Sequence, residues 1–381
     1  KHFMELRERA PANSGICSGL AHIYLWRGWH HRALREFRVI ESRDPGNVGI
    51  LTGKIAALNE VGLKSEAREA AASLLSRHPG NRHIQNLIRR FEVEETGEGN
   101  LSLVYTWDED GTKEVRAETT LSHPLSLKTR LYGFLLWQKT WDDTLESYFR
   151  RAGLGVTHHL ATSWMVRQHF AINTEDGEDF GSFTLADFHP NDYWRFEISF
   201  DSFTTDVPMR ARIFDIDADK TVFGATYRES DWRSYTLSLS TMSFSDGNRR
   251  DAALIGYEQG LWAKGDWMMR LMLDLYSSRN SLDDAPYFNP EEDYSLSVTH
   301  RTEHTLRRSR NSSHLQRFYL TLGGYKQSGF SNGLTGAVEY EHEYTFSDVH
   351  ALLLGAAVAR NVYDGEGVNS YTLSLNYTGR F

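Results

Sequence analysis

Residues 91–381 alternate apolar and polar side chains with a period of two, and this pattern constrains the fold more than any other feature. The segment WRFEISF at 194–200 is representative, with an aromatic or aliphatic residue at every second place. Such alternation is typical of β-strands, because successive side chains of a strand point to opposite faces. The pattern predicts sixteen strands, at 92–107, 113–122, 127–138, 147–157, 160–172, 181–189, 192–201, 220–228, 232–244, 250–261, 266–277, 293–305, 314–327, 333–345, 349–361 and 369–381.

The lengths of these strands and their connections predict a closed barrel. Sixteen strands over roughly 290 residues give roughly 18 residues for each strand and connection, which suits a transmembrane barrel. The connections alternate between short ones, such as HPLS, HPND, RESD, AKGD and TFSD, and long ones at 202–219 and 278–292. No apolar run of 18 or more residues occurs, so we predict no transmembrane helix.

The predicted fold is therefore an all-β transmembrane barrel of sixteen antiparallel strands over residues 91–381. An even number of strands places both ends of the barrel on one side of the membrane. Aromatic residues flank the short connections, where a membrane-interface girdle is expected: Trp194, Trp232, Trp262 and Trp267. A soluble β-domain, whose strands also alternate, is the alternative.

Residues 1–90 have a different period. The motif Pro-x-Asn recurs with its proline at positions 11, 45 and 79, at intervals of 34 residues, and Gly28 and Gly62 share this spacing. A 34-residue helix–turn–helix unit is the tetratricopeptide (TPR) period, and such repeats stack and usually bind proteins or peptides. Because the sequence opens inside a repeat, we expect it to be the C-terminal piece of a longer protein. Its single cysteine, Cys17, allows no intrachain disulfide.

Three short motifs suggest an enzyme or a metal site, but their predicted context argues against it. HRTEH at 300–304 matches an inverted zinc-protease motif, yet on a strand its two histidines would lie roughly 13 Å apart, too far for one ion. GFSNG at 329–333 lacks the strand-to-helix turn of a nucleophile elbow. Asp215, Asp217 and Asp219 begin like a calcium loop whose later positions depart from the pattern, so a weak surface cation site stays open. We expect the pair His158–His159 to be solvated in a short turn, and we predict no catalytic residue, metal or cofactor.

The polar face of the strands is the predicted lumen. Arginines at 116, 195, 270 and 317 fall on this face, as does Tyr132. Glu339, Glu341 and Glu343 line one strand at a spacing of ~6.6 Å, where they would attract cations unless neighbouring arginines neutralise them. Inward tyrosines would stack against sugar rings or simply fill the lumen. The predicted substrate path contains Glu118, Glu197, Glu258, Asp274, Glu339, Glu341, Glu343, Tyr276, Tyr319 and Tyr325.

The chain ends on NSYTLSLNYTGRF, a strand that must pair with the first strand to close the barrel. An alternating strand ending in Phe resembles the C-terminal signal of bacterial outer-membrane proteins. Four further segments, YLWRGWHHRAL (24–34), FSDGN (244–248), YFNPEEDYSLSVTH (287–300) and SLNYTGRF (374–381), resemble the PgaA/HmsH family of outer-membrane export porins for poly-β-1,6-N-acetyl-D-glucosamine. The resemblance covers the whole chain and is less clear over 92–230.

The resemblance implies a function in biofilm formation. The barrel would pass partially deacetylated poly-β-1,6-N-acetyl-D-glucosamine to the cell surface, and the periplasmic repeats would bind the periplasmic N-deacetylase. Outer-membrane lipid is the other expected partner, and no nucleic-acid partner is expected. The alternatives are an exporter of another polysaccharide such as cellulose, an outer-membrane hydrolase and an adhesion receptor.

Overall fold

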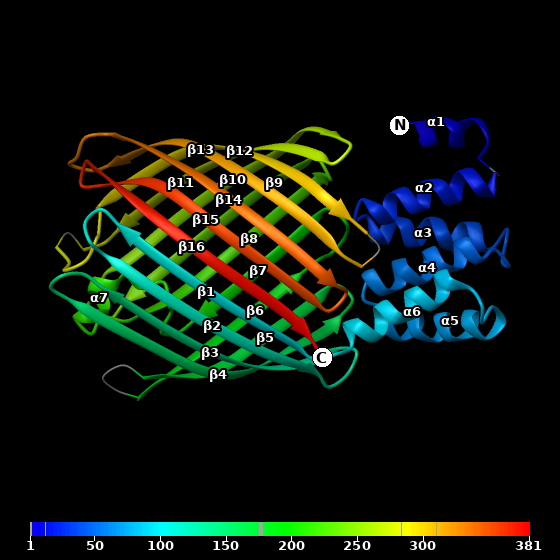
Figure 1. Cartoon of the computed structure of the whole chain (residues 1–381), viewed down its shortest axis with the longest axis horizontal. Helices are drawn as coiled ribbons and strands as arrows, with labels where there is room; N and C mark the ends of the chain where they lie inside the picture. The colour runs from blue at the N-terminus through cyan, green and yellow to red at the C-terminus, as the bar shows by residue number, and fades with distance from the viewer. Residues whose placement is uncertain (1, 12, 175–177, 283, 310) are drawn as a thin grey trace.

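The computed structural model consists of a helical part followed by a closed β-barrel (Figure 1). It describes residues 2–11, 13–174, 178–282, 284–309 and 311–381. The helical part lies at one end of the barrel, and the C-terminus lies at the same end (Figure 1). Its helices are α1 (His2–Arg9), α2 (Ser14–Trp26), α3 (His30–Glu41), α4 (Val48–Glu60), α5 (Lys64–Arg77) and α6 (Arg82–Glu94).

The 34-residue period has a clear structural basis in the helical part. The asparagine of each Pro-x-Asn motif caps a helix, and Asn47 Oδ1, for example, accepts the backbone N–H of Gly49 at 3.0 Å. Gly28 and Gly62 have φ values of 74° and 84° in the turns between paired helices. Ala33 is 0% exposed, so the helices pack closely around it. The repeat therefore forms TPR-like helix pairs; no helix in the described residues is long and apolar enough to cross a membrane.

The helical part extends further than the sequence predicted. Helix α6 continues to Glu94 and the first strand begins at Glu98, whereas the prediction placed the change at residue 91 and the first strand at 92. Residues 91–95 also fit an alternating pattern, but the ring of Phe91 continues the helical stripe of Ile84 and Leu87. That ring is buried against the guanidinium of Arg68, 3.9 Å from its centroid. Packing of Phe91 therefore decides the conformation of this segment.

The barrel contains sixteen strands within the described residues, in the number and order predicted. Each strand pairs with its sequence neighbour, and β1 pairs with β16 to close the barrel. The strands are β1 (Glu98–Asp108), β2 (Lys113–Pro124), β3 (Thr129–Trp141), β4 (Glu146–Ala161), β5 (Trp164–Thr174), β6 (Glu178–Phe188), β7 (Trp194–Asp201), β8 (Ala218–Ser230), β9 (Arg233–Phe244), β10 (Arg249–Lys264), β11 (Trp267–Asn280), β12 (Glu292–Arg308), β13 (Ser313–Gln327), β14 (Gly333–Ser347), β15 (His350–Tyr363) and β16 (Glu366–Arg380).

The outer face of the barrel is apolar, as a lipid-facing surface must be. Leu334 is 80% exposed and Leu322 is 65% exposed, and both lie on this face. Near the helical part, aromatic rings on neighbouring strands form a continuous belt, with centroids 4.4–6.4 Å apart. Its members are Trp164, Phe188, Phe196, Trp194, Tyr227, Tyr235 and Tyr257. Trp232, expected in this girdle, instead packs against Gly260, which lies opposite the inward-facing Arg270.

The two sets of connections lie at opposite ends of the barrel. Short turns meet the helical part, and Asp192, Asp231 and Asp348 in these turns contact it directly. The long connections, the β7–β8 loop (202–217) with helix α7 (Met209–Ile213) and the β11–β12 loop (281–291), lie at the other end (Figure 1). Outer-membrane barrels have short periplasmic turns and longer extracellular loops, so we assign the helical end to the periplasm and the end with the long loops to the cell exterior.

Candidate functional site

Strand register places all ten predicted substrate-path residues on one face of the barrel. Residues directly opposite each other in an antiparallel pair share a face. Glu341 lies opposite Arg317, and Arg317 lies opposite Glu303; followed from strand to strand, these pairs define a single polar face around the closed barrel. This lumen face contains Glu118, Glu197, Glu258, Asp274, Glu339, Glu341, Glu343, Tyr276, Tyr319 and Tyr325.

Arg317 gathers three lumen carboxylates into one cluster, which we call the arginine cluster. Its guanidinium lies 3.2 Å from Glu303, 3.2 Å from Glu341 and 2.6 Å from Glu343. The hydroxyl of Tyr319 also donates to Glu341, at 3.0 Å. Two of the three glutamates in the β14 row are therefore paired, but one guanidinium among three carboxylates leaves the cluster with an excess of negative charge.

Two predicted carboxylates have no ion-pair partner among the described residues, namely Glu339 and Asp274. Glu339 lies opposite Tyr319, and Asp274 lies opposite Gly256, where a Cβ atom would come within 3.1 Å of Oδ1 of Asp274. Both groups can attract a cation in the lumen. Their isolation depends on register with neighbouring strands, so the sequence did not distinguish them from the paired glutamates.

The other predicted lumen residues take part in local contacts. Arg116 pairs with Glu118 at 3.2 Å, Arg195 pairs with Glu197 at 3.1 Å, and Arg270 pairs with Glu258. The hydroxyl of Tyr325 donates to Asp293 at 3.0 Å, and Tyr276 lies opposite Ser295 on the lumen face. Tyr132 also faces the lumen, where its hydroxyl lies 3.1 Å from Nδ1 of His169.

The sequence did not predict that both long loops fold into the extracellular end of the lumen. Arg151, a lumen-facing residue of β4 that is 4% exposed, donates to the carbonyl oxygens of Phe203 and Ser202 and pairs with Asp201. Arg212 of α7 contacts the lumen-facing ring of Phe149 at 4.6 Å. These contacts hold the β7–β8 loop inside the barrel wall.

The β11–β12 loop is joined to the barrel wall through Asn248, which is 1% exposed. The side-chain nitrogen Nδ2 of Asn248 lies 3.1 Å from the hydroxyl of Tyr287 and 2.7 Å from Oδ1 of Asn289. Burial raises the pKa of Tyr287 to about 12, so its hydroxyl stays protonated and donates to Asp246 at 3.0 Å. The ring of Tyr287 also stacks on Phe244, so FSDGN and the start of YFNPEEDYSLSVTH are in direct contact.

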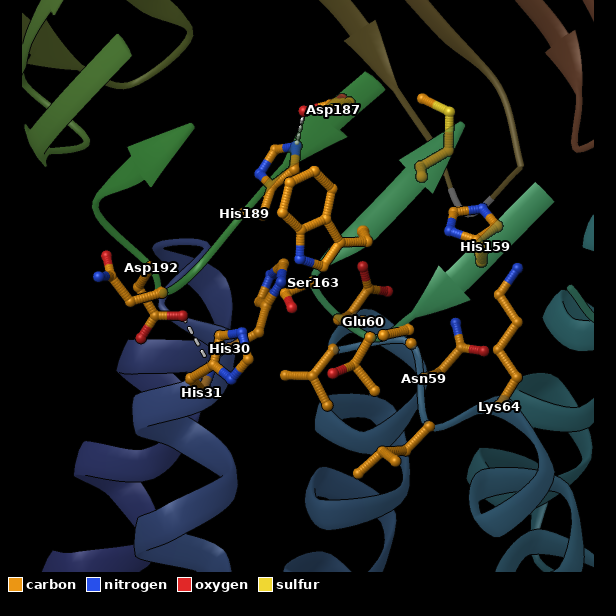
Figure 2. A pocket seen from close by; sticks show the side chains of 18 of the residues that line it. His30, His31, Asn59, Glu60, Lys64, His159, Ser163, Asp187, His189 and Asp192 are labelled. Carbon is orange, nitrogen blue, oxygen red and sulfur yellow. Dashed lines mark hydrogen bonds and ion pairs between the residues drawn. The ribbon is translucent and has the colours of Figure 1, made fainter. Parts of the chain in front are cut away.

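The periplasmic end of the lumen meets the helical part across a large pocket, the junction pocket, which Figure 2 shows. The carboxylate of Asp192 in the β6–β7 turn accepts the backbone N–H groups of His31 at 2.8 Å and Arg32 at 2.9 Å. The guanidinium of Arg32 donates to the hydroxyl of Tyr193 at 2.9 Å. These hydrogen bonds fix the start of α3 to the rim of the barrel.

The motifs that suggested enzymes lie in the predicted contexts. In HRTEH, His300 and His304 lie on the outer face of β12 whereas Glu303 faces the lumen, and GFSNG connects β13 to β14. Asp215 and Asp217 precede β8, and the described residues hold no group of three metal-ligating side chains there or elsewhere. His158 and His159 lie in strand β4 rather than in a turn, because β4 extends to Ala161.

The closed barrel, its aromatic belt and its charged lumen define an outer-membrane β-barrel with a periplasmic helical part. Residues 99–381 match the PgaA membrane beta barrel domain, and the chain belongs to this family. The chain is 22% identical over 385 residues to the poly-beta-1,6-N-acetyl-D-glucosamine export protein of Escherichia coli strain K12, and equally to that of Escherichia coli O157:H7. Each match covers 99% of this chain and 47% of the relative, so the chain spans about half the length of these relatives.

A solved structure described as a bacterial polysaccharide outer membrane secretin has the same barrel fold. It superposes with a TM-score of 0.70 at 20% sequence identity, covering 75% of this chain and 99% of that chain. The family match and this likeness agree with the fold that the alternating pattern predicted.

Proposed function

We propose that this chain exports a partially deacetylated poly-β-1,6-N-acetyl-D-glucosamine across the outer membrane for biofilm matrix formation. The relatives that match the whole chain are named for export of poly-β-1,6-N-acetyl-D-glucosamine. The observation that carries the proposal is the excess of carboxylates on the lumen face, in the arginine cluster and at the unpaired Glu339 and Asp274. Glucosamine units that have lost their acetyl groups carry a positive charge, which such a lumen attracts.

The proposed interactions suit transport better than tight retention. Ion pairs accessible to water are worth about 0–1 kcal/mol each, so a cationic unit exchanges readily between neighbouring carboxylates. Lumen tyrosines such as Tyr276 and Tyr319 would contact the sugar rings between these charges. The protein would thus act as a conduit for a polymer rather than as a catalyst.

Single-channel recording with the whole chain in planar bilayers tests the proposal. We expect partially deacetylated β-1,6-linked oligomers, added at the periplasmic side, to cause transient blocks of the current that fully acetylated oligomers and cello-oligomers do not cause. A Glu339→Gln and Asp274→Asn double variant should show fewer blocks, whereas Glu229→Gln, at the end of β8 and paired with Arg233, should not. Equal blocking by all three sugars, or an unaltered double variant, would argue for a general porin or another cargo.

We also propose that the helical part contributes to binding the periplasmic N-deacetylase. TPR-like pairs present long surfaces to protein partners, and the helical part lies beyond the end of the barrel, so the barrel does not cover its far side (Figure 1). Pull-down of the deacetylase by the whole chain, compared with a chain lacking residues 1–94, tests this idea. Equal capture by both forms would place deacetylase binding outside this helical part.

A further inference from the structure

The junction pocket has the size and position of a ligand site. Its volume is about 920 Å³, within the usual range for small-molecule sites. One wall consists of the ends and turns of the helical part, with His30, Glu60 and Lys64 (Figure 2). The opposite wall consists of the barrel rim, with Ser163 and His189. A polymer that passes along the helical part into the barrel would meet this pocket at the mouth of the lumen.

The pocket is continuous with the lumen wall. Asp187 lines the pocket and lies directly opposite Glu197, one of the lumen carboxylates. Arg195 lies 3.0 Å from Asp187 and 3.1 Å from Glu197, so one side chain joins the pocket to the lumen. Oδ1 of Asp187 also lies 3.0 Å from Nε2 of His189. Figure 2 shows His189 and Asp187 meeting above the ends of the helices.

The chemistry of the pocket differs from that of the lumen. Five carboxylates and four lysine or arginine side chains line it, so the charges of these groups nearly balance. Hydroxyl, imidazole and amide groups such as Ser163, His159 and Asn191 lie between these charges. Such a lining offers hydrogen bonds to sugar hydroxyl and acetamido groups, but no strong attraction for an amine.

We propose that the junction pocket is a saccharide-binding site that receives units of the polymer before they enter the lumen, and that it recognises hydroxyl and acetamido groups rather than amine charge. This inference rests on the proposed export of a hexosamine polymer and assigns a second site to it. The pocket selects for the sugar, and the lumen carboxylates act on the charge of its deacetylated units. Asp192 keeps the two walls of the pocket together through the start of α3.

Protection of an introduced cysteine tests the site directly. The native Cys17 is buried, so a Ser163→Cys variant of the whole chain provides a reactive thiol in the pocket. Ser73→Cys, exposed on α5 and absent from the pocket lining, is the matched control. With a fully acetylated β-1,6-linked hexasaccharide at ten times its Kd, maleimide labelling at position 163 should slow about tenfold, because only the free fraction reacts.

Three controls show whether any protection at position 163 reflects specific binding of the hexasaccharide in the pocket. Labelling at position 73 should not change, and a dextran oligomer should give no protection at position 163. His189→Ala in the Ser163→Cys background should weaken protection by the hexasaccharide. Unchanged labelling at 163 would overturn the inference, and equal protection by dextran would overturn its specificity. The labelling results do not depend on block of the channel current by deacetylated oligomers. The current recordings therefore test the proposed export function, and the labelling tests the junction pocket.

Discussion

The carboxylate of Asp192 caps the N-terminus of helix α3 by accepting the backbone N–H of His31, a residue 161 positions earlier in the chain. A second bond from the N–H of Arg32 completes the cap. The helix has no cap of its own, because Trp29 occupies the N-cap position without a side-chain hydrogen bond. One carboxylate on the barrel rim therefore supplies what the start of this helix lacks.

Replacing Asp192 with Ala should loosen the helical part from the barrel. Loss of an N-cap costs about 1 kcal/mol, which corresponds to an increase of about fivefold in the opening of the capped amides. Hydrogen exchange at His31 and Arg32 should accelerate accordingly, with exchange in the barrel strands unchanged. Asp192→Asn keeps one of the two accepting oxygens and should protect one of the two amides; equally fast exchange of both amides in both variants would contradict the capping role.

Replacing Arg151 with Met should raise the single-channel conductance. The guanidinium of Arg151 donates to two carbonyl oxygens of the β7–β8 loop, and these groups lose their partner in the variant. The loop should then leave the lumen more often. The matched control is Arg150→Met, because Arg150 is the adjacent residue on the outer face. An Arg151→Met channel with native conductance would show that other contacts suffice to hold the loop.

Replacing Arg317 with Met should make the channel more selective for cations. In the native protein the guanidinium of Arg317 neutralises part of the charge of Glu303, Glu341 and Glu343, and the variant lacks it. The reversal potential in a salt gradient measures this selectivity. Glu339→Gln should shift the reversal potential in the opposite direction, because it removes an unpaired carboxylate. A shift of the same sign in both variants would rule out control of selectivity by these charges.

The helical part should lose stability as the pH falls below 6.5. Burial lowers the pKa of His30 from its ordinary value of 6.5, and His31 and Arg228 act in the same direction, against Glu60 and Asp192. The unfolded chain therefore binds a proton more readily than the folded one, so stability is complete above pH 6.5 and declines below it. Thermal unfolding followed by the helical circular-dichroism signal measures the effect. In His30→Gln the decline should be smaller, and an identical decline would assign it to other groups.

Each of the four segments that carried the family resemblance makes a definable tertiary contact. YLWRGWHHRAL contains Trp29, His31 and Arg32, which meet the barrel rim. FSDGN and YFNPEEDYSLSVTH meet each other through Asn248 and Tyr287. SLNYTGRF closes the barrel against β1, where the backbone N–H of Gly97 donates to Phe381 at 2.9 Å.

The sequence by itself determined the sixteen strands, the faces of their side chains and the 34-residue helical period. These features are local, because a strand repeats every second residue and a helix pair repeats within one unit. Tyr319 and Glu339 could be assigned to the lumen on this basis alone. The end of α6 was one exception, because Phe91 fits both periods and its packing against Arg68 decided between them.

Only the tertiary structure decided which charges are paired and where the loops lie. Arg317 reaches glutamates on two neighbouring strands, so its partners depend on the register of three strands at once. The inward position of the β7–β8 loop depends on Arg151, about fifty residues earlier, and the cap on α3 depends on a turn in the barrel. Such contacts join residues that are far apart in sequence, and the packing of the loops and of the helical part against the barrel brings them together.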